Sequence, residues 1–269
     1  ALQIYFDFSA YSDMAIGLGR MFGIDLPINF ASPYKATSIA DFWRRWHITL
    51  SRFLRDYLYV PLGGNRRGLW RQRANLIATM ALGGLWHGAG WTFLLWGALH
   101  GVYLLVNHAW SRTALAGRLG ANVLWRHAAH ALTLIAVIVA WVPFRAADLP
   151  TTLAMWRGMA GFNGIVPPAR GTEGLPSTGV LGALESVSLE TAVLAAALLA
   201  AVLLLPNAGE IMRAARLGTP SRGYPATVIA TDAPRPWRPT YATGGLLAAA
   251  LALVILKIND VSEFIYFQF

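Results

Sequence analysis

Residues 74–108 read ANLIATMALGGLWHGAGWTFLLWGALHGVYLLVNH, and their pattern is the strongest indication of the fold class. It contains apolar runs at 74–88 and 91–108, which are separated by Gly88-Ala89-Gly90, and the first run is interrupted by Gly83-Gly84. As helices, runs of this length come close to spanning a hydrocarbon core of ~30 Å. The stretch predicts a hairpin of helices with a break at membrane depth. Broken backbone is tolerated there only where it is buried in protein or lines a cavity.

The composition of the whole chain agrees with a lipid environment. Apolar residues make up 56% of the 269 positions and charged residues 13%, with a mean hydropathy of +0.47. An ordinary soluble domain carries about 25% charged residues. These values exclude a disordered chain and a nucleic-acid binder, and they disfavour a standard soluble enzyme. The absence of cysteine excludes disulfides, thiolate metal sites and a cysteine nucleophile.

Further apolar runs at 127–144, 189–206 and 241–258 complete the prediction of an all-α fold, a polytopic transmembrane helical bundle. The net charge of +9 is concentrated between the runs rather than spread over a surface. The positive-inside rule places positively charged loops in the cytoplasm. It assigns loops 35–73, 111–126 and 207–240 to that side, and the neutral loop 145–188 and the C-terminus to the outside. Because the chain starts at Ala1 within an apolar stretch, we expect a C-terminal part of a longer protein.

Within the most basic loop, residues 35–73, the segment 36–64 has the pattern of an amphipathic helix. Ser38-Ile39-Ala40-Asp41 has the form of a capping box, and Pro61 with Gly63-Gly64 ends the pattern. Apolar residues recur on one arc of about 120°, and they are Ile39, Phe42, Trp43, Trp46, Leu50, Phe53, Leu54 and Tyr57, with Arg44, Ser51 and Arg55 opposite. This predicts one helix in the cytoplasmic membrane interface. This helix either anchors to anionic lipid or presents its arginines to an anionic substrate. The sequence pattern does not distinguish between these two roles.

Histidines inside the apolar runs are the candidate chemical groups. An ionisable side chain in a membrane usually faces a bundle interior or a wet cavity, and imidazole is the usual general base. His87 lies among glycines that allow close approach of a substrate, whereas hydrogen bonding to a neighbouring helix is the favoured interpretation of His100. For His87 both interpretations stay open. No histidine pair has the spacing of a metal site, so no metal is expected.

Several motifs together resemble the membrane-bound O-acyltransferase (MBOAT) family, and the bacterial alginate O-acetyltransferase branch in particular. The motifs are YFDFSAYSDMAIGLG at 5–19, FWRRWHITLS at 42–51, LRDYLYVPLGGN at 54–65, GGLWHG at 83–88, the weaker WVPFRA at 141–146 and the ending FIYFQF at 264–269. The resemblance implies that 1–269 is the C-terminal part of one MBOAT domain, without its N-terminal helices. It contains the interfacial segment 36–64 and a catalytic hairpin at 74–108.

The resemblance also implies a chemistry. His87 matches the catalytic histidine of the family and His47 the second functional histidine of the branch. Such enzymes transfer acetyl from acetyl-CoA, a substrate rather than a bound cofactor, across the bacterial inner membrane towards an exopolysaccharide. The usual partner is a periplasmic or extracellular SGNH-type acetyltransferase, and alginate is the expected kind of polymer. Peptidoglycan, cellulose, a glycolipid, or D-alanyl transfer to teichoic acid are alternatives.

Burial keeps a histidine neutral, which is the form a general base requires. We therefore expect His87 to take the proton of a hydroxyl that attacks the thioester. Substrate binding is assigned to Arg44, Arg55, Trp86 and Asn65. The arginines, with Arg66 and Arg67 nearby, would hold the phosphates of CoA. A membrane transporter and a non-catalytic scaffold of a polysaccharide export complex are the competing functions, because intramembrane histidines and broken helices also occur in transporters.

Overall fold

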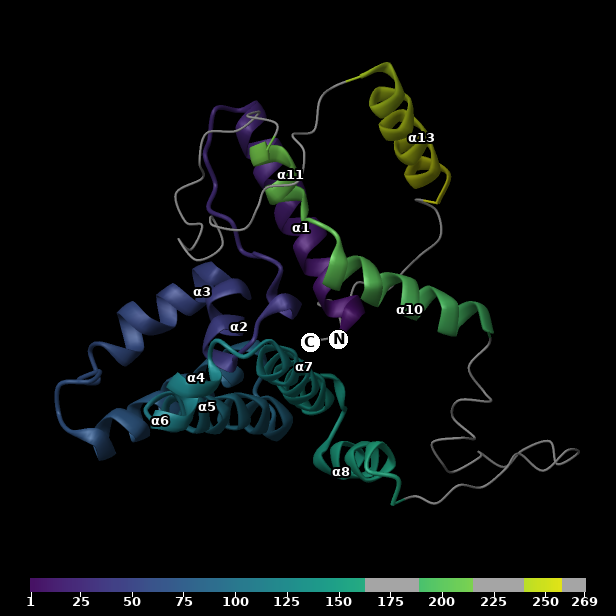
Figure 1. Ribbon diagram of the computed structural model, residues 1–269. Helices are drawn as coiled ribbons and strands as arrows, with labels where there is room; N and C mark the ends of the chain where they lie inside the picture. The colour runs from purple at the N-terminus through teal and green to yellow at the C-terminus, as the bar shows by residue number, and fades with distance from the viewer. Residues whose placement is uncertain (163–188, 215–239, 258–269) are drawn as a thin grey trace, which may run out of the picture.

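A computed structural model describes residues 1–162, 189–214 and 240–257, and within these residues all regular secondary structure is helical (Figure 1). This confirms the predicted all-α class for the described residues. The elements are α1 (Leu2–Met21), η1 (Pro33–Lys35), α2 (Ile39–Arg45), α3 (Ile48–Phe53), η2 (Leu54–Tyr59), α4 (Leu69–His87), α5 (Trp91–Ser111), α6 (Ala114–Leu119), α7 (Val123–Arg145), α8 (Leu149–Met159), α10 (Leu189–Leu204), α11 (Ala208–Ala214) and α13 (Tyr241–Lys257).

The predicted hairpin is present, because α4 and α5 run side by side over most of their lengths (Figure 1). Its break differs from the prediction. Gly83 and Gly84 do not interrupt the helix, and the chain turns instead at Gly88–Gly90, where the backbone of both terminal glycines is extended. Gly83 and Gly84 both remain helical because each lets a neighbouring segment pack close to α4. The missing Cβ atom of glycine permits such close approach.

Glycines bring the backbones of α4 and α5 into direct contact. A Cβ atom at Gly84 would lie 2.2 Å from the carbonyl oxygen of Phe93, and one at Gly97 would lie 2.2 Å from that of Met80. Small residues at such positions are the usual means of close helix packing in membranes. Gly84 therefore serves the packing of the hairpin rather than its turn. Gly83 instead makes room for Leu54 of η2 (Leu54–Tyr59), whose Cδ1 would lie 2.9 Å from a Cβ atom at Gly83.

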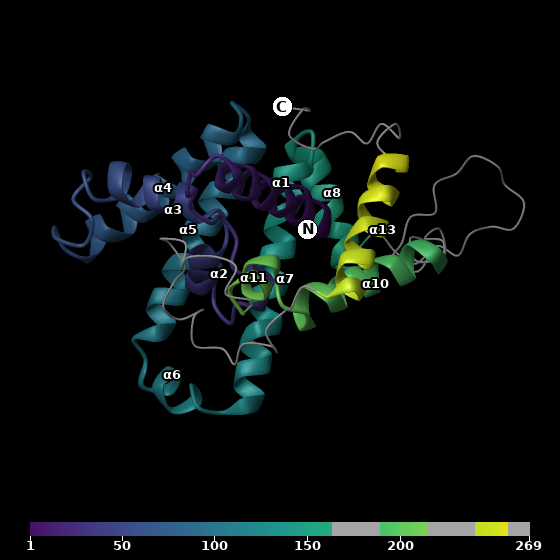
Figure 2. The ribbon, with the colours of Figure 1, turned by 90° about the horizontal axis from the view of Figure 1, so that it is seen from above.

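One helix among the described residues, α7, is both long enough and apolar enough to cross a membrane. It corresponds to the predicted run 127–144 but begins earlier, after Asn122, whose side chain accepts a hydrogen bond from the backbone N–H of Trp125 at 3.0 Å. The short helix α6 connects α5 to α7 (Figure 2). Shorter apolar helices occupy Glu190–Leu204 and Tyr241–Leu256, in the regions of the two later predicted runs.

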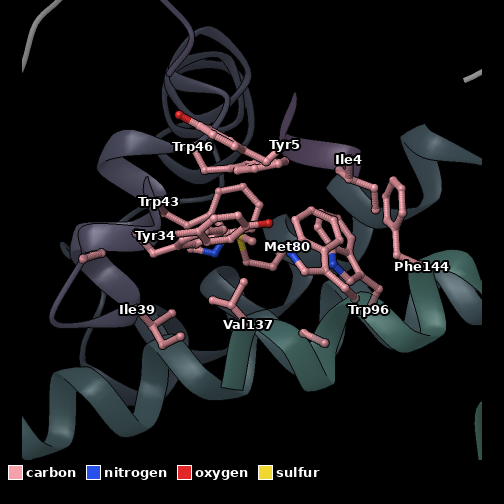
Figure 3. Close-up of a cluster of buried hydrophobic side chains, with 14 of the residues drawn as sticks. Ile4, Tyr5, Tyr34, Ile39, Trp43, Trp46, Met80, Trp96, Val137 and Phe144 are labelled. Carbon is pink, nitrogen blue, oxygen red and sulfur yellow. The ribbon is translucent and has the colours of Figure 1, made fainter. Parts of the chain in front are cut away.

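An aromatic cluster joins the N-terminal third of the chain to the hairpin and α7. Tyr34, Trp43 and Trp46 gather on one side of it and Trp96 and Phe144 on the other (Figure 3). All five side chains are at most 7% exposed. The aromatic face of α2 is thus covered by protein, so it is not the face that α2 offers to lipid.

The predicted single helix over the basic segment is wrong. Ser38 does cap α2 and accepts a hydrogen bond from the backbone N–H of Asp41 at 3.1 Å. The helix then ends at Arg45, because Trp46 is extended and His47 has a left-handed backbone with φ of 41°. The chain resumes as α3 and continues into η2, a π-helical turn. π-helical turns are frequent at functional sites.

Candidate functional site

His87 ends α4 at the turn of the hairpin, and its half-buried imidazole is held by aromatic rings. The ring centroids of Trp86, Trp96 and Phe144 lie 4.9, 5.3 and 5.1 Å away, each close to perpendicular. Within the described residues neither ring nitrogen of His87 makes a hydrogen bond. Its nitrogens are therefore available to a substrate while the ring itself is fixed by packing.

His47 lies close to His87, although the two are far apart in the sequence. Its ring is 4.7 Å from that of Phe8 in α1 and 6.4 Å from that of Trp86. Trp86, which is 65% exposed, therefore contacts both histidines. Three of the residues assigned from the sequence thus form one cluster.

The environment of His47 favours its neutral form. Burial, and to a lesser extent the charge of His87, lowers the pKa of His47 to about 4. A neutral imidazole at pH 7 can accept a proton or a hydrogen bond, as a general base must. Nδ1 of His47 lies 3.2 Å from the Oδ1 atom of Asn29, a residue for which the sequence offered no signal.

His100 belongs to the core. It is fully buried, and its Nδ1 accepts a hydrogen bond of 3.2 Å from the indole N–H of Trp43 in α2. This confirms the interpretation of His100 as a histidine hydrogen-bonded to a neighbouring helix.

Substituting Trp43 with phenylalanine is expected to lower the melting temperature of the detergent-solubilised protein. The change keeps the ring packing but leaves Nδ1 of His100 buried without its donor, which costs about 1–3 kcal/mol. Trp110→Phe is the matched control, because Trp110 packs against Trp125 with ring centroids 5.0 Å apart and makes no comparable buried hydrogen bond in the described structure. Equal melting temperatures for both variants would contradict the structural role of His100.

A second group of predicted residues lines a pocket of about 390 Å³ between η2, α4 and the end of α5. Arg55 and Asn65 both contribute to it, together with Arg112, which the sequence had assigned only to a positive loop. Asn65 accepts hydrogen bonds from Tyr59 and Gln72. The lining residues are Trp43, Ser51, Leu54, Arg55, Tyr59, Asn65, Gln72, Leu76, Thr79, Met80, Leu104, His108, Ser111 and Arg112.

The charges at this pocket are exposed and mostly cationic. Arg55 donates to the carboxylate of Asp56 at 2.7 and 3.2 Å, and this pairing lowers the pKa of the carboxyl group. Arg44 is exposed on α2, outside the pocket but close enough to His108 for their charges to interact. The rim can therefore attract an anion.

The predicted site residues fall into two groups. One lies around His87 at the turn of the hairpin, and the other lines the pocket beside α4 and α5. The pocket reaches Thr79 and Met80 in α4, and Thr79 precedes His87 by about 12 Å of helix. Arg66 and Arg67 are exposed and do not line the pocket. In the part of the chain that the structure describes, no group of three or more histidine, aspartate or glutamate side chains could hold a metal ion.

Comparison with known proteins places this arrangement in a family. Residues 1–117 match the model of the membrane-bound O-acyltransferase family. The chain belongs to the MBOAT family. The match includes both histidines of the cluster, the basic segment and the whole hairpin.

The relatives of this MBOAT chain are named after different polymers. It is 53% identical over 165 residues to a peptidoglycan O-acetyltransferase of Helicobacter pylori, an alignment that covers 61% of this chain and 31% of the relative. It is 36% identical over 294 residues to a probable alginate O-acetylase AlgI of Pseudomonas syringae pv. tomato, covering 99% of this chain and 54% of the relative. A teichoic acid D-alanyltransferase of Streptococcus thermophilus is 35% identical over 117 residues, covering 41% of this chain and 28% of the relative. The chain thus spans between about a third and about half of the relatives that it matches.

Proposed function

We propose that this MBOAT chain carries the acyl-transfer site of a membrane enzyme that moves an acetyl group from acetyl-CoA for the O-acetylation of an exopolysaccharide. The observation that carries the proposal is the cluster of His47, Trp86 and His87 at the turn of the hairpin. His87 offers ring nitrogens without hydrogen bonds, and the neighbouring His47 is neutral.

In the proposed step, His87 takes the proton of an acceptor hydroxyl as the hydroxyl oxygen attacks the thioester carbonyl carbon. The new C–O bond forms, the C–S bond breaks, and the proton on His87 passes to the departing CoA thiolate. General base assistance of this kind is worth about 10²–10⁴ in rate. Trp86, Trp96 and Phe144 hold the imidazole in place during this exchange.

The donor is proposed to enter through the basic pocket. Arg55 and Arg112 line it, and guanidinium groups bind phosphate in a bidentate manner. In acetyl-CoA a long flexible arm separates the phosphates from the thioester. Phosphates held at the arginines therefore leave the thioester free to reach towards His87 along α4.

The name of a relative supports the proposed acceptor, and the charges of the loops support the proposed topology. The relative that aligns with 99% of this chain is named a probable alginate O-acetylase, so alginate or a similar exopolysaccharide is the proposed polymer. We place the enzyme in the bacterial inner membrane as a multi-pass protein with loops 35–73, 111–126 and 207–240 in the cytoplasm and the C-terminus outside. A periplasmic or extracellular SGNH-type acetyltransferase is the proposed partner that completes transfer to the polymer.

The proposal is tested by the dependence of transfer on acetyl-CoA concentration. In vesicles containing the full-length protein, Arg55→Gln combined with Arg112→Gln is expected to raise KM for acetyl-CoA about tenfold or more, because charged hydrogen bonds contribute about 1.5–3 kcal/mol each. Arg118→Gln is the control, since Arg118 is exposed on α6 away from the pocket. An unchanged KM in the double variant would contradict the donor site. The absence of any covalent transfer by the wild-type protein would favour a transporter or a scaffold.

A further inference from the structure

Asn29, in the segment between α1 and η1, holds the site histidine His47 through one atom. Its Oδ1 atom accepts hydrogen bonds from the backbone N–H of Thr49 at 3.2 Å and from the Thr49 hydroxyl at 2.7 Å, and it lies 3.2 Å from Nδ1 of His47. A backbone N–H can only donate, so the atom facing it must be the amide oxygen rather than the amide nitrogen. This fixes the orientation of the Asn29 side chain.

The orientation of Asn29 in turn fixes the tautomer of His47. An amide oxygen cannot donate a hydrogen bond, so Nδ1 of His47 must carry the proton of this contact. A neutral imidazole has one N–H, and its second nitrogen is then an acceptor. Nε2 of His47 is therefore left with an available lone pair.

Asn29 also holds the backbone of His47. The backbone carbonyl of Asn29 accepts the N–H of Ile48 at 3.1 Å, and its side chain accepts the N–H of Thr49. These are the first two N–H groups of α3, which would otherwise lack partners because the side chain of His47 does not cap this helix. One residue thus sets the left-handed backbone and the ring orientation of His47 together.

We propose that Asn29 is a positioning residue for acyl transfer, which holds His47 with Nδ1 protonated and with Nε2 ready to accept a hydrogen bond from a substrate group beside His87. The catalytic role of Asn29 rests on the proposed function. The placement of His47 by Asn29 rests on the hydrogen bonds described above. The carboxylate of Asp41 on the neighbouring helix α2 is paired with Arg45 at 2.9 Å. Among the described titratable groups packed around His47, His87 is the one whose charge acts on it.

Replacing Asn29 with aspartate separates this role from a purely structural one. Aspartate keeps oxygen acceptors for Ile48 and Thr49, so α3 stays capped. The added negative charge raises the pKa of His47 from about 4 and increases its protonated fraction as the pH falls. The rate of Asn29→Asp relative to wild type is therefore expected to drop roughly twofold to tenfold between pH 8 and pH 6 in full-length protein. For Thr49→Val, which removes only one hydrogen bond to the same oxygen, this ratio is expected to be independent of pH.

A spectroscopic measurement tests the geometry without relying on transfer. In full-length protein labelled with ¹⁵N-histidine, the signals of His47 are assigned by their loss in His47→Gln. In the wild type, His47 is expected to be the Nδ1–H tautomer at pH 7. In Asn29→Asp, the imidazole of His47 is expected to titrate at a higher pH than in the wild type. An Nε2–H tautomer, or a pH-independent rate ratio for Asn29→Asp, would overturn the positioning role. If the wild type transfers no acetyl group, the proposed function fails while the tautomer result still decides the role of Asn29.

Discussion

Replacing His87 with alanine in the full-length protein is expected to abolish O-acetylation of the exopolysaccharide while the protein remains in the membrane. Alanine cannot take the proton of the acceptor hydroxyl, and loss of a general base lowers the rate by about 10²–10⁴. The measurement is the acetyl content of the polymer from cells that carry the variant, together with the amount of protein in the membrane fraction.

His127→Ala is the matched control for this experiment. His127 lies exposed near the start of α7, away from the cluster of His47, Trp86 and His87, and its replacement is expected to leave polymer acetylation at the wild-type level. Normal acetylation by well-expressed His87→Ala would remove the catalytic assignment. It would also favour the alternative of a non-catalytic scaffold, which tolerates substitution at this position.

Gly97→Ala is expected to damage the fold severely. The added Cβ would lie 2.2 Å from the carbonyl oxygen of Met80 and 3.0 Å from the Cα of Ala81. Both obstacles are backbone atoms of α4, so a side-chain rotation cannot relieve the clash and the hairpin must separate. Overpacking typically costs about 1–3 kcal/mol, and a backbone clash belongs at or above the upper end.

Thermal unfolding of the detergent-solubilised protein measures this effect. Gly97→Ala is expected to melt at a clearly lower temperature or to fail to yield folded protein. Gly17→Ala is the matched control, because a Cβ on this residue of α1 would meet no atom within 4 Å and alanine favours helix by about 0.5–1 kcal/mol. Equal melting of the two variants would show that α4 and α5 do not pack as closely as described.

The hairpin could be predicted from the sequence because its signals are local. Apolar runs define α4 and α5, and Gly88-Ala89-Gly90 marks the turn. The role of Gly83 and Gly84 could not be read in the same way. A glycine that permits close packing and a glycine that ends a helix look alike until the opposing helix is in place.

The interruption at His47 lay beyond sequence reasoning for a different reason. The apolar spacing continues from Trp46 to Leu50 as if the helix were unbroken. What breaks it is the hydrogen bonding of Asn29, a residue nearly twenty positions away, to the backbone of α3. Long-range contacts of this kind leave no periodic pattern.

The candidate site shows the same division. His47, Trp86 and His87 were assigned from motifs, and the structure brings them together. Arg55 and Asn65 were assigned to substrate binding, and they share a pocket with Arg112, which comes from the end of α5. The sequence could not associate Arg112 with them, because that contact exists only once the hairpin has formed.

Acetyl transfer by His87→Ala in vesicles shows whether His87 acts as the general base. Vesicles containing full-length wild-type or variant protein are supplied with acetyl-labelled acetyl-CoA, the partner acetyltransferase and polymer, and covalent label and CoA binding are followed together. The wild type is expected to transfer label, and His87→Ala is expected to lose at least about a hundredfold in rate while it still binds CoA. These results would identify His87 as the general base. Transfer by the variant at the wild-type rate would contradict this assignment.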